Sequence, residues 1–383
     1  KKSSYELIDS TIENKFNPTI DQYIGNDSNM RKLILLSNPC NPTGITRHGN
    51  ELKELVEKAS FSENGLLVDE AYELFHTPPV SALEYIKDID NSNLFVAGAA
   101  TKGLQTPGIR IGWVVAAKKY IRNTIKETEP DIIVNCAAKV GGILANNTYR
   151  SDFLIQNLKI NLNLLEVLKE FNNIRLINLG SSCIYPLNAV NPINEVSFLD
   201  GKLEPTNSPY AIAKIAGIEL GKEISNEFGN KIINLMPTNL YGPNDNFSEL
   251  DSHVIPGLIH RMAIAKQSGD EIFKIWGTGN PLREFMYVDD LSYAVEFLLD
   301  VETENDLINV GSGEEISIND LSVLIKKIVN FEGSIENDLS KPDGNPRKLL
   351  DSSLLNSMGW SSKIGLEEGL LKTFEWYQNN IMN

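Results

Sequence analysis

Four polar side chains near the middle of the 383-residue chain have types and spacing that suit proton transfer to a carbonyl compound. Ser181 and Cys183 lie in the run GSSCIYP, and Tyr210 and Lys214 follow in PYAIAK. A tyrosine followed four residues later by a lysine places both side chains on one face of a helix. The ammonium group can then lower the pKa of the phenol and hold the sugar of a nicotinamide cofactor. We therefore predict one active site that contains all four residues.

The segments that must position these residues alternate between strand-like and helical patterns. A helix is predicted at about 150–170, where Leu154, Leu158, Leu162 and Leu165 form an apolar stripe. Runs typical of strands lie at 32–37, 64–70, 94–100, 109–115, 131–138, 175–182 and 231–242. Such alternation predicts an α/β architecture with a parallel sheet, in which Ser181 lies near the end of a strand.

Composition narrows the class of protein. Apolar residues make up 42% of the chain and charged residues 22%, which is ordinary for a soluble enzyme. The net charge of −16 argues against nucleic acid and anionic membranes as partners. Cys40, Cys136 and Cys183 are widely separated, which predicts no disulfide framework and favours the reducing cytoplasm. No apolar run is long enough to span a membrane, and the four histidines have no metal-ligand spacing.

From about residue 122 onward, the motifs resemble one known family. The segments that carry the resemblance are LGSSCIYP, SPYAIAKIAGIEL, MPTNLYGPNDNF, SHVIPGLI, WGTGNPLREFMYVDDL and KPDGNPRKLLD. Their order and spacing are similar to those of the GDP-L-fucose synthases, which are extended short-chain dehydrogenase/reductases. The resemblance implies 3,5-epimerisation of a GDP-linked 4-keto-6-deoxy-D-mannose, followed by NADPH-dependent reduction at C4 to GDP-L-fucose.

The resemblance assigns roles to five residues. A 4-keto group acidifies the hydrogens at C3 and C5, so inversion needs a base on one face and an acid on the other. A thiolate and an imidazole can do this, and the resemblance implies Cys183 and His253. For the reduction it implies Tyr210 as proton donor, Ser181 as the group that polarises the carbonyl, and Lys214 as the group that tunes the phenol.

The resemblance also implies the binding residues and a partner. Arginine suits a diphosphate because its planar fork makes bidentate, charge-assisted hydrogen bonds. The implied GDP-sugar site contains Arg261, Trp276, Arg283 and Asp343. The implied cofactor-binding residues are Lys214, Pro237, Thr238, Asn239, Leu240 and His253. The family dimer uses a helix bundle, so we expect a homodimer formed by the helices at about 150–170 and 210–228.

The glycine-rich turn that opens this family's fold is missing from the chain. In the family, a GxxGxxG turn lets a helix N-terminus approach the cofactor pyrophosphate. Here the first strand that resembles the family is 131–138, which is the fourth strand of the family's sheet. We therefore expect an incomplete Rossmann-like sheet, a small C-terminal α/β substrate domain and weak NADPH binding.

The segment before it resembles a different family. SNPCNPTG, VDEAY and TKGLQTPGIRIGW, within about 31–121, are similar to motifs of class I/II aminotransferases, which are fold-type I enzymes with pyridoxal phosphate. That resemblance implies Asn41, Asp69, Tyr72, Lys102 and Arg110 as the remnant of a pyridoxal phosphate site. Only 36 residues precede SNPCNPTG, so the fragment is truncated and we expect no bound cofactor there.

The chain therefore divides into an aminotransferase-like fragment at 1–121 and an epimerase/reductase-like region at 122–383. It is either a fusion in which the first part completes the sheet of the second, or a misassembled sequence. The leading hypothesis for its function is GDP-L-fucose synthesis. The alternatives are a pyridoxal phosphate-dependent aminotransferase, which an absorbance band of a Lys102 aldimine would favour, and a non-catalytic GDP-sugar-binding protein, which GDP-sugar binding without NADPH binding would favour.

Overall fold

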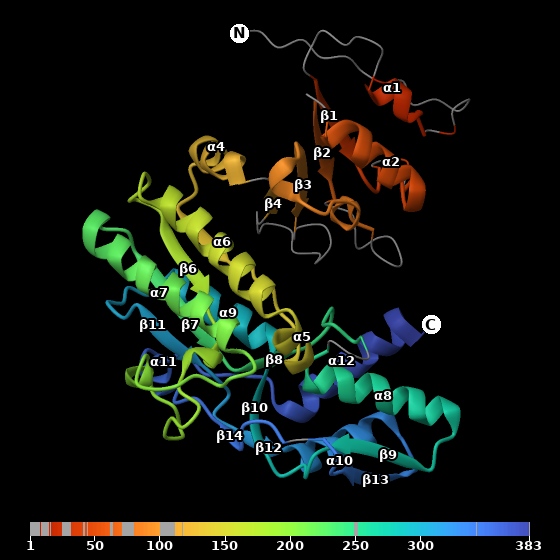
Figure 1. Cartoon of the computed structure of the whole chain (residues 1–383), viewed down its shortest axis with the longest axis vertical. Coiled ribbons are helices and arrows are strands. Elements are labelled where there is room, and N and C mark those ends of the chain that lie inside the picture. Colours follow the sequence, from red (N-terminus) through yellow and green to blue (C-terminus); the bar gives the residue numbers. More distant parts are fainter. Residues whose placement is uncertain are drawn as a thin grey trace. The chain divides into compact units, whose positions relative to one another are not determined.

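The chain folds into two compact units, Lys1–Glu129 and Pro130–Asn383 (Figure 1). The computed structural model describes residues 8, 15, 17–24, 32–40, 43, 45–61, 64–70, 80–99, 112–116, 118–248, 252–341 and 343–382. Both units contain parallel strands and helices, so the predicted α/β class with parallel sheets is confirmed.

The first unit contains a sheet in the order β1-β2-β3-β4. Its described elements are α1 (Ile20–Ile24), β1 (Leu33–Ser37), α2 (Gly49–Ser60), β2 (Gly65–Asp69), η2 (Ala82–Tyr85), η3 (Ile89–Asn91), β3 (Leu94–Ala99), β4 (Gly112–Ala116) and α4 (Lys118–Thr128). The strands β1, β2 and β3 are parallel, and β4 is antiparallel to β3. Leu52 and Leu55 of α2 are buried against this sheet, whereas Leu33 and Leu35 of β1 are exposed. One apolar side of β1 is therefore uncovered, although both faces of a parallel sheet are normally covered.

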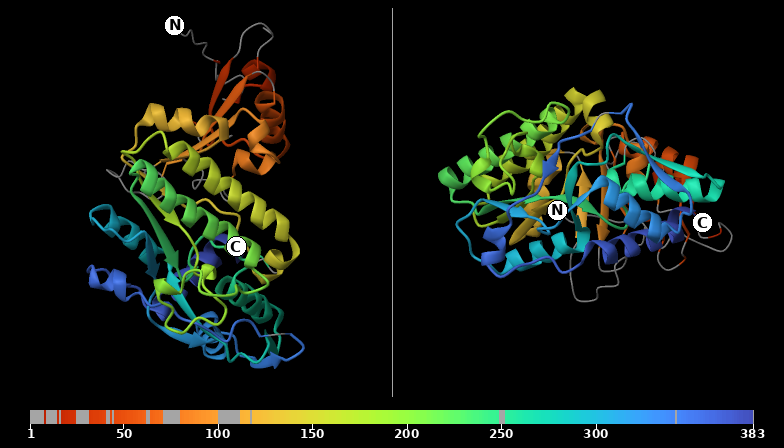
Figure 2. Two further views of the ribbon diagram at one scale, coloured as in Figure 1. Left: turned by 60° about the vertical axis from the view of Figure 1, so that its left-hand side comes forward. Right: turned by 90° about the horizontal axis from the view of Figure 1, so that it is seen from below.

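The second unit is built on a parallel sheet in the order β11-β7-β6-β5. Its strands are β5 (Ile132–Asn135), β6 (Arg175–Leu179), β7 (Ile232–Pro237) and β11 (Leu307–Val310). The helices α5 (Ile143–Thr148), α6 (Arg150–Leu168) and α7 (Ser208–Phe228) belong to the same half, and α6 and α7 pack side by side (Figure 2). This sheet brings the ends of β6 and β7, which precede Ser181 and Thr238, to the same edge.

Three buried asparagines fix the register of this sheet. Asn135 of β5, Asn178 of β6 and Asn234 of β7 are aligned across neighbouring strands. The Asn135 amide donates to Asn178 Oδ1 at 2.8 Å, and the Asn178 amide donates to Asn234 Oδ1 at 2.9 Å. A slip of one residue would separate these groups and leave buried amides without partners, which is costly.

The C-terminal half adds a smaller α/β layer around β10 (Leu282–Tyr287). β10 pairs with β8 (Asn239–Tyr241), β12 (Glu315–Ser317) and β14 (Arg347–Lys348), and β9 (Ile272–Trp276) pairs with β13 (Ser334–Asp338). The accompanying helices are α8 (Val254–Ser268), α9 (Val288–Leu299), α10 (Ile318–Val329), α11 (Ser353–Ser357) and α12 (Leu366–Tyr377), and η6 (Gln378–Met382) follows α12. An aromatic-rich core lies between α8, α10 and α12. This layer carries the residues expected to bind GDP.

The buried face of α6 differs from the predicted leucine stripe. Leu165 is buried, but Leu162 is exposed, and the buried positions include Asn157 and Asn161. Asn157 exchanges two 3.0 Å hydrogen bonds with the Lys139 backbone, and the Asn161 amide donates to Ala213 O at 3.1 Å. The leucine stripe is therefore only partly buried, and polar amides share the buried face because neighbouring backbone groups satisfy their hydrogen bonds.

Candidate active site

Ser181 lies where the chain leaves the central sheet. β6 ends at Leu179, and Ser181 then caps the short 3₁₀ helix η4 (Ser182–Ile184). Its Oγ accepts a hydrogen bond from the Cys183 backbone N–H at 3.4 Å, a role for which serine is well suited. This cap brings the Ser181 hydroxyl and the Cys183 thiol to the edge of the sheet where the parallel strands end.

Tyr210 and Lys214 come from the first turns of α7. Pro209 occupies the start of that helix, where proline is tolerated because the N–H would have no intrahelical partner. The Lys214 side chain is buried, and its Nζ donates to Leu179 O at 2.8 Å. The same Nζ lies 5.8 Å from the centre of the Tyr210 ring. The carbonyl at the end of β6 therefore anchors the ammonium beside the phenol, as the four-residue spacing predicts.

Burial dominates the electrostatics of Tyr210. Burial, and secondly the nearby Cys183, raise the pKa of the Tyr210 phenol, whereas a hydrogen bond with Ser181 lowers it. Burial likewise lowers the pKa of the Lys214 ammonium. The expected lowering of the phenol pKa is therefore not seen. The physical reason is that desolvation disfavours the charged form of both groups, and the Lys214 ammonium is hydrogen-bonded to a backbone carbonyl.

Burial also dominates the electrostatics of Cys183. Its thiol is buried, and burial raises the pKa of Cys183 from its ordinary value. Lys348 gives the largest opposing effect, followed by the hydrogen bond to Ser181 and the charge of Lys214. A thiolate base needs a lowered pKa, and burial acts in the opposite direction. Lys348 and Lys214 nevertheless favour the thiolate.

His253 comes from a different element than the other predicted catalytic residues. It is the N-cap residue of α8 and its side chain is exposed. Among the described residues, no hydrogen bond or ion pair joins it to Ser181, Cys183 or Tyr210. Ser181, Cys183, Tyr210 and Lys214 are thus brought together, and the acid role of His253 stays a prediction.

Arg261 and Trp276 form one part of the predicted GDP site. The guanidinium carbon of Arg261 lies 5.6 Å from the centre of the Trp276 ring, and Lys341 lies 5.7 Å from the same ring. The Trp276 side chain is 56% exposed, which leaves part of its aromatic surface available for stacking. Cations beside an exposed aromatic ring suit a planar base attached to phosphates.

Asp343 and Arg283 form the other part. Asp343 accepts hydrogen bonds from the Thr278 backbone N–H at 2.8 Å and from the Thr278 hydroxyl at 2.7 Å. This holds the turn after Trp276, where Gly277 has a φ of +71° and any side chain would collide with Asp343. Asp343 also raises the pKa of the neighbouring Arg283 guanidinium, although burial lowers it more. Asp343 therefore links the Trp276 turn to Arg283.

The stretch predicted to lie beside the nicotinamide runs through the end of β7 into β8. Thr238 and Asn239 both donate to the backbone carbonyl of Glu284, at 3.2 Å and 2.8 Å. Pro237 is the last residue of β7, and Leu240 pairs with Met286 across β8 and β10. This stretch is thus fastened to the strand that carries Arg283.

Two residues that sequence reasoning missed belong to the site. Lys348 is half-buried. Desolvation, and then the neighbouring Arg283, lower the pKa of the Lys348 ammonium, and Lys348 also acts on Cys183. Glu284 is fully buried and bonds several segments. In the sequence, Glu284 and Lys348 were marked only by their presence in the segments LREF and PRKLLD. Strand pairing brings the two residues together from distant positions, which sequence spacing does not reveal.

Most of the predicted pyridoxal phosphate remnant lies outside the described residues. This holds for Asn41, Tyr72, Lys102 and Arg110. Asp69 is described: it is the last residue of β2, it is exposed, and its carbonyl accepts from Asn38 N at 2.9 Å. The structure therefore does not test this cofactor site.

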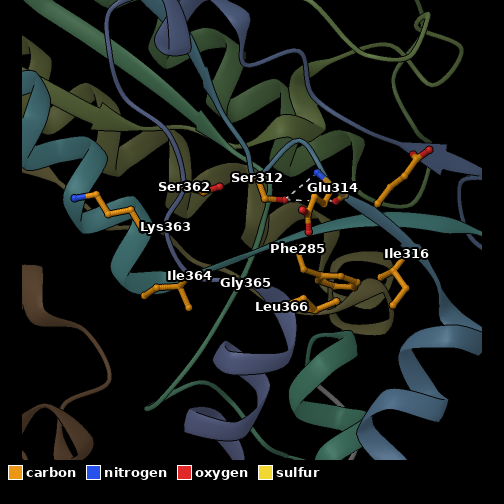
Figure 3. A pocket seen from close by; sticks show the side chains of 10 residues that line it. Phe285, Ser312, Glu314, Ile316, Ser362, Lys363, Ile364, Gly365 and Leu366 are labelled. Carbon is orange, nitrogen blue, oxygen red and sulfur yellow. Dashed lines mark hydrogen bonds between the residues drawn. The ribbon is translucent and has the colours of Figure 1, made fainter.

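A cavity of about 340 Å³ is lined in part by Phe285 of β10 (Figure 3). It is lined by Phe285, Ser312, Glu314, Glu315, Ile316, Ser362, Lys363, Ile364, Gly365 and Leu366. None of these lining residues belongs to the predicted site. Within the described ranges, no helix has the length and apolar character of a membrane span, and no group of His, Cys, Asp or Glu side chains is arranged to hold a metal.

The chain matches two family models and several named relatives. The NAD dependent epimerase/dehydratase family matches residues 109–311, which is more than half of the chain, and the aminotransferase class I and II family matches residues 3–193. GDP-L-fucose synthase 1 of Arabidopsis thaliana is 49% identical over 263 residues, covering 69% of this chain and 81% of that protein. GDP-L-fucose synthase of Escherichia coli is 46% identical over 261 residues, covering 65% of this chain and 81% of that protein.

Among solved structures, a GDP-L-fucose synthetase from Naegleria fowleri bound to NADP superposes with a TM-score of 0.64. It is 27% identical and covers 70% of this chain and 82% of that chain. The motifs that bring Ser181, Cys183, Tyr210 and Lys214 together lie inside the region matched by the epimerase family. The chain therefore belongs to the NAD-dependent epimerase/dehydratase family and, within it, to the GDP-L-fucose synthases.

Proposed function

We propose that the chain binds a GDP-linked 4-keto-6-deoxy sugar and catalyses its 3,5-epimerisation, with NADPH-dependent reduction at C4 as the second activity. The observation that carries the proposal is the joined group of Ser181, Tyr210 and Lys214 beside Cys183, in a region of 263 residues that is 49% identical to a GDP-L-fucose synthase. Identity at this level supports the substrate class, and the site geometry supports the chemistry.

In the proposed reaction each side chain has one task. Cys183 takes the proton from the carbon next to the ketone, and His253 returns a proton on the opposite face. Ser181 donates a hydrogen bond to the ketone oxygen, and Tyr210 donates the proton that this oxygen receives. Lys214, anchored on Leu179 O, holds the phenol and the sugar side of the cofactor.

The residues present fit only one end of NADPH. Tyr210, Lys214 and the stretch from Pro237 to Leu240 fit the nicotinamide end, where NADPH supplies a hydride when it is bound. The sequence carries no GxxGxxG turn for the pyrophosphate. We propose that cofactor binding is weak, and that the chain therefore retains the epimerisation activity when the reduction activity is low or absent.

We also propose that the parallel sheet is an incomplete Rossmann-like sheet. β5 is the last strand in the described order, and Val134 in its middle is 40% exposed. The family's sheet would continue from this strand. The uncovered side of β1 supports the interpretation that the first unit is also a truncated fragment, similar to part of an aminotransferase.

The proposal includes a homodimer in the cytoplasm. Ile155 and Leu162 of α6 and Ile212 of α7 are exposed apolar side chains on adjacent helices, which suits a helix-bundle interface between two copies. The cysteines Cys40, Cys136 and Cys183 are all unbonded thiols, which suits a reducing compartment.

Solvent deuterium exchange into C3 and C5 of the keto sugar tests the proposal without any cofactor. We expect the parent chain to exchange both positions and Cys183→Ser to lose the exchange while it still binds GDP-sugar. Cys136→Ser is the matched control, because it also removes a thiol near Lys214 but not the proposed base. Exchange by Cys183→Ser at the parent rate would exclude Cys183 as the base.

A second candidate function rests on the aminotransferase family match over residues 3–193. If the first unit still binds pyridoxal phosphate through Lys102, the chain mixed with the cofactor will show a visible aldimine band that Lys102→Ala lacks. The absence of such a band would leave the epimerase/reductase function as the one activity proposed.

A further inference from the structure

Glu284 is a carboxylate placed where solvent cannot reach it. Its side chain is fully buried, with 0% exposure, on the strand β10. A buried charge is costly unless it is hydrogen-bonded, so the structure must supply donors. It does: Oε1 accepts from Gly313 N at 2.8 Å, and Oε2 accepts from Leu350 N at 3.0 Å. Burial nevertheless raises the pKa of Glu284, and these backbone donors lower it.

The two donors come from segments far apart in the sequence. Gly313 belongs to the loop between β11 and β12, and Leu350 lies two residues after the end of β14. Any side chain at Gly311 would collide with the Glu284 carboxylate, so this loop fits closely around it. Through its own backbone carbonyl, Glu284 also receives the bonds from Thr238 and Asn239. One residue therefore fastens three segments to β10.

Two cations lie on the strands that Glu284 joins. Arg283 of β10 is aligned with Lys348 of β14 in a parallel pair. Neighbouring residues of a strand point to opposite faces, so Arg283 and Lys348 share the face opposite to the Glu284 side chain. The two like charges oppose each other, since Arg283 lowers the pKa of the Lys348 ammonium. Keeping them together therefore requires a clamp elsewhere on the strands.

We propose that Glu284 is a positioning residue that clamps β14 and the Gly313 loop onto β10, so that Arg283 and Lys348 together face the diphosphate of the nucleotide sugar. This inference rests on the proposed function, because it presumes that Arg283 binds GDP. Glu284 does not touch the ligand; it acts through the cation pair. A paired arginine and lysine match the charge of a diphosphate better than either cation alone.

The test is GDP binding measured by calorimetry on the full chain. Glu284→Gln keeps the shape of the side chain but replaces one carboxylate oxygen with an amide nitrogen. That nitrogen then faces a backbone N–H donor, so one hydrogen bond is lost. We expect this variant to weaken GDP binding about tenfold. Glu315→Gln is the matched control, because Glu315 pairs with Glu284 in register but forms an exposed ion pair with Arg347. That control should bind GDP within about twofold of the parent.

A double-mutant cycle separates positioning from general stability. If Glu284 acts through Arg283, the effect of Glu284→Gln should shrink to less than about threefold in an Arg283→Ala background. A purely structural role would give the same factor in both backgrounds and would overturn the inference. Amide hydrogen exchange at Gly313 and Leu350 should accelerate in Glu284→Gln, which shows that the clamp itself has opened.

The outcomes also separate the inference from the function it rests on. A parent chain that does not bind GDP refutes the proposed function. A parent that binds GDP, together with a Glu284→Gln variant that binds equally well, refutes the inference alone. If Glu284→Gln does not fold, Glu284→Asp replaces it. Its shorter carboxylate cannot reach both donors, so the same loss of affinity is expected and parent-like binding refutes the clamp.

Discussion

Replacing Lys348 should change the reactivity of a thiol that belongs to a distant part of the chain. Burial raises the pKa of Cys183 above its ordinary 9.0, and Lys348 is the group that opposes this most strongly. Lys348→Met keeps most of the side-chain volume and removes the charge. Without that charge the thiolate is less favoured, so Cys183 should need a higher pH to become reactive.

The expected change in the alkylation rate of Cys183 follows from the direction of its pKa shift. Because burial raises the pKa of Cys183, only a small fraction of the thiol is ionised at neutral pH. Its alkylation rate should therefore rise about tenfold per pH unit between about pH 6 and pH 9. Removing a unit charge from a partly screened site should slow the reaction by about three- to tenfold at a fixed pH.

The assay is iodoacetamide alkylation followed by mass spectrometry of the peptide that contains Cys183, so that Cys40 and Cys136 do not interfere. Lys341→Met is the control, because Lys341 lies over the Trp276 ring, whereas Lys348 and Lys214 are the lysines that act on the Cys183 thiol. A reaction rate in the parent that levels off below about pH 8 would refute the reasoning about burial. An identical profile in Lys348→Met would refute the role of Lys348.

Three further predictions concern binding and stability. Arg283→Ala should weaken GDP binding by roughly 1.5–3 kcal/mol, the range for hydrogen bonds to charged groups, and an unchanged affinity in calorimetry would exclude this site. NADPH should bind weakly, because losing pyrophosphate contacts worth about 4 kcal/mol raises the dissociation constant nearly a thousandfold, so a micromolar value would contradict it. Asn178→Ala should destabilise the chain by about 2–4 kcal/mol in urea unfolding, because it removes the partner of the Asn135 side-chain N–H and the partner of Asn234 Oδ1, both of which are buried. The exposed Asn305→Ala is the control for that variant, and an equal loss in both would show that the asparagine row is not stabilising.

The sequence alone determined the features that depend on local spacing. The four-residue interval between Tyr210 and Lys214 places both on one face of a helix in any fold that forms it. Apolar runs likewise predicted the strands, and β6 and β7 lie within the predicted ranges. Motif order was enough to indicate the family, because Ser181, Cys183, Tyr210 and Lys214 lie in segments that carry it.

Tertiary structure decided everything that depends on burial and on pairing between distant strands. The direction of the Cys183 pKa followed from desolvation, which no spacing in the sequence reveals. Lys348 and Glu284 entered the site because β14 pairs with β10, although more than sixty positions separate them. The buried side of α6 was equally invisible, because Asn157 and Asn161 are polar residues that only the packed backbone can satisfy. Local periodicity reports which residues share a face, whereas the three-dimensional fold determines what that face meets.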